Sequence, residues 1–273
     1  MLTIGRIDYA NVTPIFHALR EHFSCDGYRF TAGVPARLNS LLAAGEIDVC
    51  PSSSIEYALR AERYLIIPGL SISSIGAVAS VLLFSHVPIE ELDGCEIMLS
   101  AESATSVNLL RILMAKRFGC ACRYAVSNVA PAEALGSAPA MLLIGDAALR
   151  TSMAGTGLRV YDLGTLWHEW TGLPFVFALW FCTRTAARER RQEVRKLAEE
   201  LVLAKQYAER EREHIARVSP EAAWMGFERL MAYWRENISY ELGGGEQNGL
   251  RLFYRYAAEL ELIPTAPELC FFE

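Results

Sequence analysis

Apolar residues in the first part of the chain alternate between the spacing of buried strands and that of amphipathic helices. Short apolar runs rich in β-branched and aromatic residues predict strands at residues 2–8, 28–33, 47–51 and 64–68. Between them, helices are predicted from Thr13 and Pro14 onward and over residues 35–44 and 52–61. This alternation of strand and helix predicts a mostly parallel sheet covered by helices.

Two longer apolar runs, residues 75–84 and 174–182, predict fully buried strands at the points where one strand–helix series stops. A second series lies between them, with strands predicted at residues 95–100, 120–126, 140–144 and 159–163. Helices are predicted over residues 104–118 and just before Arg150. The two long runs are therefore expected to be crossover strands between two lobes.

After Thr183 the chain becomes charge-rich and predicts helices over residues 186–218, 220–236 and 246–261. We expect an α/β protein of two lobes, with the fold of the type II periplasmic binding proteins, which close on a ligand through a hinge. Residues 1–84 and 183–273 would form the first, discontinuous lobe, and residues 85–182 the inserted second lobe. One continuous doubly wound sheet is the alternative.

Composition narrows the classes of function. The chain is 52% hydrophobic and carries a net charge of −6, which argues against a nucleic-acid partner. The first residues lack the basic and apolar segments of a signal peptide, and the apolar runs are too short to span a bilayer. Seven cysteines without a C-x-x-C pair indicate reduced thiols. We therefore expect a cytoplasmic protein that binds no membrane.

Four predicted strand-to-helix turns carry the candidate chemistry, because ligands of open α/β sheets bind beyond the carboxyl ends of strands. They are residues 9–14, 51–54, 100–106 and 145–146. Two of them are rich in hydroxyl groups and open a helix, where unpaired N–H groups favour a carboxylate. Helix capping alone would also explain such serines and threonines. Two such turns facing one cleft would suit a ligand with two carboxylates.

Other kinds of site have no signature in the sequence. None of the five histidines lies in a Ser-His-Asp arrangement or an H-E-x-x-H spacing, and no phosphate loop is present. We therefore expect no metal and no cofactor.

The residues also carry a resemblance to a known family. The sequence resembles the MqnA/MqnD menaquinone-biosynthesis enzymes of the futalosine pathway, and within them the chorismate dehydratase branch. The segments that carry the resemblance are GRIDYANVTP at 5–14, GVPARLN at 33–39, GEIDVCPSSSIEY at 45–57, GAVASVLL at 76–83, ESATS at 102–106, LIGDAAL at 143–149, YDLG at 161–164 and EWTGLPFVFA at 169–178.

The resemblance implies a periplasmic-binding-protein-like fold used for catalysis. The implied enzyme is a carbon–oxygen lyase, specifically a hydro-lyase, and its reaction removes water from chorismate, a dicarboxylate, to give 3-[(1-carboxyvinyl)oxy]benzoate without a cofactor.

Within this reaction we expect Asn11 and Ser80 to position the ring and the enolpyruvyl group, and Asp146 to be a candidate acid or base. The substrate's own side-chain carboxylate is the other candidate base. The expected substrate-binding residues are Tyr9, Ser52, Ser53, Ser103, Ala104, Thr105, Ser106, Gly145, Trp170 and Pro174.

Two other functions stay open. The sister lyase of the pathway makes 1,4-dihydroxy-6-naphthoate from cyclic dehypoxanthine futalosine, and the resemblance there expects a histidine near Gly145, which this chain lacks. A non-catalytic binding protein for an aromatic carboxylate would use the same cleft. The sequence leaves the oligomeric state open, including a homodimer.

Overall fold

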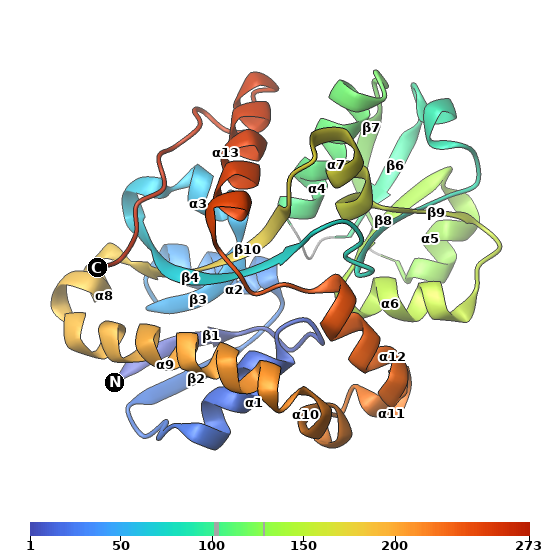
Figure 1. Ribbon diagram of the computed structural model, residues 1–273. Coiled ribbons are helices and arrows are strands. Elements are labelled where there is room, and N and C mark those ends of the chain that lie inside the picture. The colour runs from blue at the N-terminus through green and yellow to red at the C-terminus, as the bar shows by residue number, and fades with distance from the viewer. Residues whose placement is uncertain (101–103, 128) are drawn as a thin grey trace.

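The strands form two sheets in the computed structural model, which describes residues 1–100, 104–127 and 129–273 (Figure 1). The first sheet has the order β2-β1-β3-β10-β4 and the second the order β7-β6-β8-β5-β9. The strands of the first sheet are β1 (Leu2–Arg6), β2 (Tyr28–Ala32), β3 (Val49–Ser53), β4 (Tyr64–Ser74) and β10 (Phe175–Thr183). Those of the second are β5 (Val81–Ser85), β6 (Glu96–Leu99), β7 (Arg123–Val126), β8 (Ala140–Ile144) and β9 (Arg159–Asp162).

Each sheet contains one strand that runs antiparallel to both of its neighbours. In the first sheet β1 runs parallel to β2 and β3, and β10 lies antiparallel between β3 and β4. In the second sheet β6 runs parallel to β7 and β8, and β5 lies antiparallel between β8 and β9. This arrangement confirms the two-lobed α/β fold with two crossover strands.

The first crossover strand is shorter than the sequence pattern predicted. The apolar run at residues 75–84 becomes a strand only from Val81, and residues 75–80 connect β4 to β5. The Asp162 carboxylate accepts the N–H groups of Val78 and Ala79 at 3.1 and 2.6 Å, which removes these donors from any strand ladder. Since β5 pairs within the second sheet, the strand at the end of the predicted first lobe (1–84) belongs with the residues after it. The division into those lobes stays a prediction.

The helices flank both sheets (Figure 1). Beside the first sheet lie α1 (Thr13–His22), α2 (Pro35–Ala44), α3 (Ser54–Leu59), η1 (Ala61–Arg63), α8 (Arg184–Glu189), α9 (Arg191–Arg210) and α10 (Arg212–Val218). Beside the second lie η2 (Ile89–Leu92), α4 (Ala104–Ile112), η3 (Leu113–Arg117), α5 (Pro131–Ser137), α6 (Gly145–Ala154) and α7 (Leu163–Thr171). The C-terminal part adds α11 (Ala222–Met225), α12 (Phe227–Ala232), η4 (Tyr233–Asn237) and α13 (Gly244–Glu259).

The single helix predicted over residues 186–218 is divided into α8, α9 and α10. Arg190 leaves the helical conformation, with φ −130° and ψ 39°. Its guanidinium group forms two hydrogen bonds of 2.8 Å with the carboxylate of Asp48, which also accepts the N–H of Thr3. The break therefore ties the start of α9 to the first sheet.

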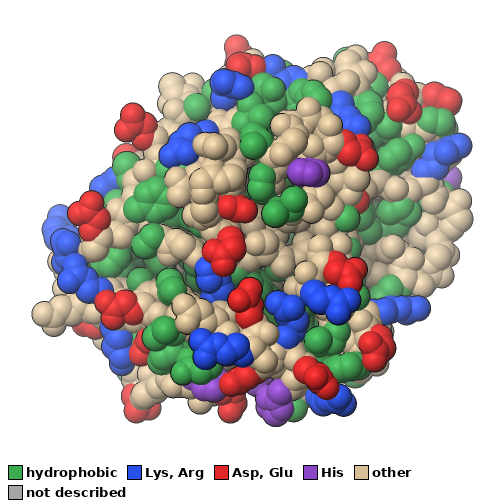
Figure 2. Space-filling view, viewed as in Figure 1, with side chains coloured by type: hydrophobic (Ala, Val, Ile, Leu, Met, Phe, Trp, Pro, Cys, Tyr) green, Lys and Arg blue, Asp and Glu red, His purple; other side chains and the backbone are tan. Residues whose placement is uncertain are grey.

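The core is continuous from the first sheet to most of the second, because one cluster of buried apolar side chains includes residues of both. On the face in Figure 2, cationic and acidic side chains are interspersed rather than gathered by sign. No helix in the described ranges is long and apolar enough to cross a membrane.

Candidate active site

A small cavity of about 50 Å³ lies where the ends of β1, β3 and β8 meet β10. Its walls come from both sheets and from the crossover connection between β4 and β5. The lining residues are Ile7, Tyr9, Asn11, Pro35, Ser53, Ile72, Val78, Ser80, Val81, Ser106, Ile144, Gly145, Phe177 and Ala178. Ligand sites of this fold class are expected at such strand ends.

Five of the lining side chains are polar, and all five were candidates: four lie in the predicted strand-to-helix turns, and Ser80 lies in a segment that carries the family resemblance. Tyr9 and Asn11 follow β1, Ser53 ends β3, Ser80 precedes β5, and Ser106 lies in the first turn of α4. The Asn11 Oδ1 atom is buried and has no hydrogen-bond partner among the residues that the structure describes. A buried acceptor without a donor costs free energy, which a ligand hydroxyl or N–H group would recover.

The crossover connection holds Ser80 firmly. Ser80 is 2% exposed, and its carbonyl oxygen accepts the N–H of Gly145 at 2.8 Å. Its Oγ atom accepts a hydrogen bond of 2.9 Å from the Tyr233 hydroxyl and lies 3.3 Å from the carbonyl oxygen of Val78. The preceding residue, Ala79, has a φ of +58°, an uncommon conformation for a residue with a side chain. Ser80 is thus fixed by contacts to two distant segments, at Gly145 and at Tyr233.

Gly145 lets the two lobes approach each other at the cavity. Its φ is +57°, and a Cβ atom there would lie 3.0 Å from Cδ2 and Cε2 of Tyr9. The absence of a side chain therefore allows the Tyr9 ring to lie against the start of α6.

The described cavity lining contains no side chain of Lys, Arg, His, Asp or Glu. Hydrogen bonding to a ligand there falls to hydroxyl groups, the Asn11 amide and backbone N–H groups. Such neutral donors can bind carboxylates, above all near the first turn of a helix. Within the described part of the chain, no group of three His, Cys, Asp or Glu side chains is placed to hold a metal ion.

Several predicted site residues lie elsewhere. The Ser52 hydroxyl is buried against Asn39 Oδ1. Thr105 Oγ1 accepts the N–H of Ile55 at 3.1 Å and lies 3.3 Å from Ser54 Oγ, so it joins α4 to α3 rather than facing the cavity. Ser103 lies outside the described residues.

Three further candidates have packing contacts instead of contacts with the cavity. The carbonyl oxygen of Ala104 accepts a hydrogen bond from the side chain of Asn108. The Trp170 ring stacks on Tyr256 with centroids 5.1 Å apart. The carbonyl oxygen of Pro174 accepts the indole N–H of Trp167. None of these three lines the cavity, and their proposed contact with substrate stays a prediction.

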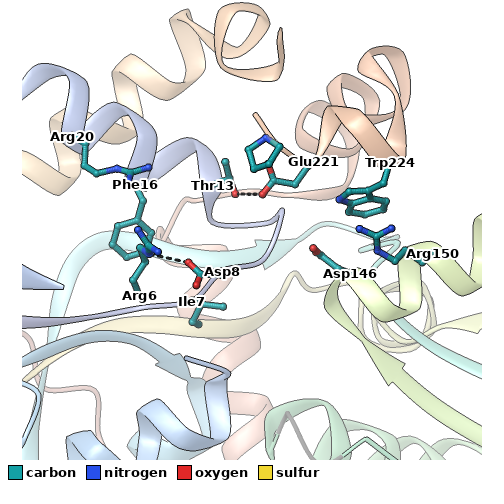
Figure 3. Close-up of a pocket in the computed structure, with 11 residues that line it drawn as sticks. Arg6, Ile7, Asp8, Thr13, Phe16, Arg20, Asp146, Arg150, Glu221 and Trp224 are labelled. Atoms are coloured by element: carbon teal, nitrogen blue, oxygen red, sulfur yellow. Dashed lines mark hydrogen bonds and ion pairs between the residues drawn. The ribbon is translucent and has the colours of Figure 1, made fainter. Parts of the chain in front are cut away.

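Asp146 lies on a different, more open cavity of about 510 Å³ (Figure 3). Its Oδ1 atom accepts the N–H of Ala10 at 3.1 Å, which links α6 to the turn after β1. This cavity is lined by Arg6, Ile7, Asp8, Thr13, Phe16, Arg20, Asp146, Arg150, Pro220, Glu221 and Trp224. Only Ile7 lines both cavities, so Asp146 lines a different cavity from Asn11 and Ser80.

The residues that sequence reasoning missed are the apolar walls, above all Ile72, Val78 and Phe177. Val78 and Phe177 lie within segments that carry the family resemblance, which was the available signal. Ile72 lies beyond Pro68, where the predicted strand ended, so no pattern placed it near the cavity.

Comparison of the sequence with known proteins finds a matching family model and similar enzymes. The sequence model of a family described as menaquinone biosynthesis matches residues 2–259. A chorismate dehydratase of Thermus thermophilus is 32% identical to the chain, with 97% of this chain and 96% of that protein covered. A chorismate dehydratase of Campylobacter jejuni is 30% identical, with 68% and 70% covered.

Comparison with solved structures shows the fold. A protein of Archaeoglobus fulgidus superposes with a TM-score of 0.75 at 19% identity and covers 96% of this chain and 98% of its own. The periplasmic aliphatic sulphonate binding protein SsuA of Escherichia coli superposes with a TM-score of 0.67 at 15% identity, covering 98% and 90%. The chain therefore has the fold of periplasmic binding proteins.

Proposed function

Because this chain belongs to the menaquinone-biosynthesis family, we propose that it is a chorismate dehydratase, which converts chorismate into 3-[(1-carboxyvinyl)oxy]benzoate and water. The observation that carries the proposal is the 32% identity to a chorismate dehydratase over 97% of the chain. The match to the family model, over residues 2–259, includes every strand that borders the cavity. The proposal includes a cytoplasmic location, and the substrate is the only partner it requires.

The cavity suits the substrate class in its choice of polar groups. Chorismate carries two carboxylates and a ring hydroxyl, and the lining offers neutral donors such as Ser53 and Ser106 for the carboxylates. The Oδ1 atom of Asn11, which has no partner among the described residues, would accept a hydrogen bond from the ring hydroxyl. Apolar residues, including Ile72 and Phe177, would contact the ring.

The proposed reaction removes a proton from ring carbon C3 and hydroxide from C4, and the aromatic ring of the product supplies the driving force. Since no carboxylate or histidine lines the described cavity, we assign proton removal to the side-chain carboxylate of the substrate. Asn11 and Ser80 would hold the substrate so that this carboxylate reaches the C3 hydrogen. The proton and the departing hydroxide together form the water that is released.

The small volume of the cavity implies that the lobes part before chorismate binds. A volume of about 50 Å³ is far below the roughly 300–1,000 Å³ of most ligand pockets. The contacts that would break on opening are the Asp146–Ala10 hydrogen bond, the Thr105–Ile55 hydrogen bond and the packing of Tyr9 on Gly145. All three join the start of α6 or the start of α4 to the first sheet's lobe.

The test is incubation of the purified protein with chorismate, followed by liquid chromatography and mass spectrometry. We expect a product lighter than chorismate by one water, formed without an added cofactor.

Asn11→Ala should lower kcat at least about tenfold, because it removes a group that positions the substrate. The matched control is Asn248→Ala, since Asn248 is exposed on α13. If the substrate is its own base, kcat stays flat between about pH 6 and about pH 9.

Two outcomes would contradict the proposal. Folded protein that binds chorismate and leaves it unchanged would indicate a binding protein. Folded protein that ignores chorismate but consumes cyclic dehypoxanthine futalosine would indicate the sister lyase. Full turnover by Asn11→Ala would remove only the role given to Asn11.

A further inference from the structure

Three aromatic residues near the C-terminus each donate a hydrogen bond to the segments that carry Asn11 and Ser80. We call Tyr233, Trp234 and Tyr240 the aromatic clamp. The Tyr233 hydroxyl donates to Ser80 Oγ at 2.9 Å, and the Trp234 indole donates to the carbonyl oxygen of Ala10 at 2.7 Å. The Tyr240 hydroxyl donates to the carbonyl oxygen of Asn11 at 2.8 Å. All three clamp side chains are at most 8% exposed, so these bonds form away from solvent.

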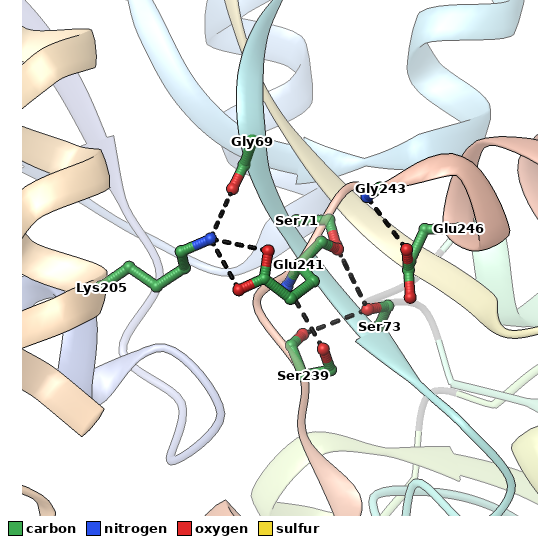
Figure 4. A network of polar contacts seen from close by, with 8 residues as sticks. All are labelled: Gly69, Ser71, Ser73, Lys205, Ser239, Glu241, Gly243 and Glu246. Carbon is green, nitrogen blue, oxygen red and sulfur yellow. Dashed lines mark hydrogen bonds and ion pairs between the residues drawn. The ribbon is translucent and has the colours of Figure 1, made fainter.

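The clamp is anchored to the first sheet by the chain that follows it. Ser239 forms an antiparallel bridge with Ser73 of β4, and the carbonyl oxygen of Tyr240 accepts the N–H of Ser71. Figure 4 shows Lys205 of α9 reaching both the carboxylate of Glu241 and the carbonyl oxygen of Gly69. The clamp therefore sits on a framework of buried or charge-assisted hydrogen bonds.

Tyr233 differs from the other two members because its acceptor is a side chain. A serine hydroxyl has one proton to donate and two lone pairs to accept. Tyr233 is fully buried, and this burial raises the pKa of its phenol, so the group keeps its proton and acts as the donor. Ser80 Oγ then accepts from Tyr233 and keeps its own proton for another partner.

The partners available to that proton are few. Among the described residues, the only protein group that accepts from Ser80 Oγ is the carbonyl oxygen of Val78, at a long 3.3 Å. The other direction open to the hydroxyl is the cavity, which Ser80 lines. The backbone of Ser80 cannot turn away, since Gly145 holds its carbonyl group and Asp162 binds the two preceding N–H groups.

We propose that Tyr233 is a positioning residue, which acts through Ser80 by holding its hydroxyl group as a hydrogen-bond donor to the substrate. This inference deepens the proposed dehydratase function and rests on it. The geometry of the clamp supports this role. The buried Tyr233 hydroxyl, which is anchored to the first sheet, donates to the hydroxyl of Ser80, which contacts with the second sheet hold in place.

The test compares single-atom variants. Tyr233→Phe keeps the ring and removes the donor. We expect kcat for chorismate to fall about fivefold to tenfold with KM within about twofold, as for loss of one oriented hydrogen bond. The matched control is Tyr64→Phe, because Tyr64 is also fully buried and donates to one side chain, Glu56, away from the cavity. The control should lose comparable stability and retain kcat.

A double-mutant cycle with Ser80→Ala decides whether Tyr233 acts through Ser80. If it does, Tyr233→Phe lowers kcat in the wild-type background and has no further effect in Ser80→Ala. Equal losses of kcat in both backgrounds, or a kcat of Tyr233→Phe equal to that of Tyr64→Phe, would overturn the proposal.

The same cycle separates this inference from the proposed function. If the wild-type protein leaves chorismate intact, the dehydratase proposal falls and the cycle is measured as chorismate affinity by calorimetry. Coupling between positions 233 and 80 in that affinity supports the role of Tyr233, and additivity overturns it. Absence of chorismate binding by the wild-type protein overturns both proposals.

Discussion

At the scale of single residues, three consecutive serines show how finely the site depends on side-chain direction. Ser52 is hydrogen-bonded to Asn39, Ser53 lines the cavity, and Ser54 donates to the carbonyl oxygen of Val176 at 2.8 Å. Successive residues of a strand point to opposite faces, so neighbours with the same chemistry receive different roles. Only the middle hydroxyl is placed to contact a ligand.

This difference predicts opposite effects for two neighbouring substitutions. Ser53→Ala should raise KM for chorismate about threefold to tenfold with little change in stability, because it removes a donor to the substrate. Ser52→Ala should leave KM unchanged and lower the free energy of unfolding by about 1–3 kcal/mol, since the buried Asn39 oxygen loses its donor. Steady-state kinetics and urea unfolding check both. An unchanged KM in Ser53→Ala would remove that residue from the site.

A second residue-scale prediction concerns the glycines at the two ends of α6. Gly145→Ala should lower kcat/KM about tenfold or more and destabilise the protein by about 1–3 kcal/mol, because the new Cβ meets the Tyr9 ring. Gly155→Ala is the control, because its φ is +71° but a Cβ there meets nothing within 4 Å. It should cost about 1 kcal/mol of stability and leave turnover intact. Equal turnover in the two variants would show that the Tyr9 contact is unimportant.

At the scale of elements, α13 lies unusually close to the second crossover. A Cβ atom at Gly249 would lie 2.1 Å from the carbonyl oxygen of Pro174, so the helix touches the start of β10 through bare backbone. Phe253, one turn further on, packs on Phe175 with ring centroids 5.0 Å apart. The C-terminal helix therefore packs against β10, the strand that lies between β3 and β4.

We expect Gly249→Ala to lower the free energy of unfolding by about 2–3 kcal/mol, because α13 must shift away from β10. Gly136→Ala is the control within another helix, α5, where a Cβ meets nothing within 4 Å. That change should stabilise the protein by up to about 1 kcal/mol. Thermal and urea unfolding compare the two. A destabilisation of Gly249→Ala no larger than 0.5 kcal/mol would contradict the close contact, whose cost rests on overpacking.

The sequence pattern identified most elements as helix or strand, but it did not show which strands far apart in the sequence pair with each other. The strand predicted to stop at Pro68 continues to Ser74, because Pro68 lies at an irregularity in the pairing of β4 with β10. A proline is tolerated at such a place, since no ladder hydrogen bond is required of it. The irregularity exists only once β10 is paired with β4, so no local pattern could reveal it.

The sequence predicted which turns contribute to the candidate site, but it did not predict which way each side chain points. The turn residues Tyr9, Asn11, Ser53, Ser106 and Gly145 line the cavity, as does Ser80, which only the family resemblance indicated, and their roles toward a substrate stay predictions. Ser52 and Thr105 have suitable chemistry but face protein partners, and Asp146 faces the open cavity. Which hydroxyl faces a cleft depends on the packing between lobes, which the sequence does not display.

At the scale of the whole molecule, buried phenols set the response to alkaline pH. Burial raises the pKa of Tyr57 to about 12 and raises the pKa of Tyr233, Tyr240 and Tyr254 as well. In the unfolded chain these groups ionise near pH 10. Above that pH the folded state therefore binds more protons than the unfolded state, and stability falls as pH rises. Below about pH 10 the contribution is fully present.

We expect the urea midpoint to be nearly constant from about pH 8 to about pH 9.5 and to fall steeply above about pH 10. Phenolate absorbance should show that only part of the eleven tyrosines ionise before unfolding. Tyr64→Phe, which removes one buried phenol with a raised pKa, should flatten the fall. A midpoint that holds to pH 11.5, or ionisation of all eleven in the folded protein, would contradict the prediction.

The place of β10 between β3 and β4 has a consequence for synthesis on the ribosome. β4 ends at Ser74 and β10 begins at Phe175, about 100 residues later. At a translation rate of about 10 residues per second, the position of β10 between β3 and β4 stays unfilled for on the order of ten seconds. During that time the growing chain completes the second sheet while β3 and β4 expose unpaired edges, which attract other strands. Nascent chains arrested before residue 175 should therefore be strong chaperone clients, and release past residue 183 should end that dependence.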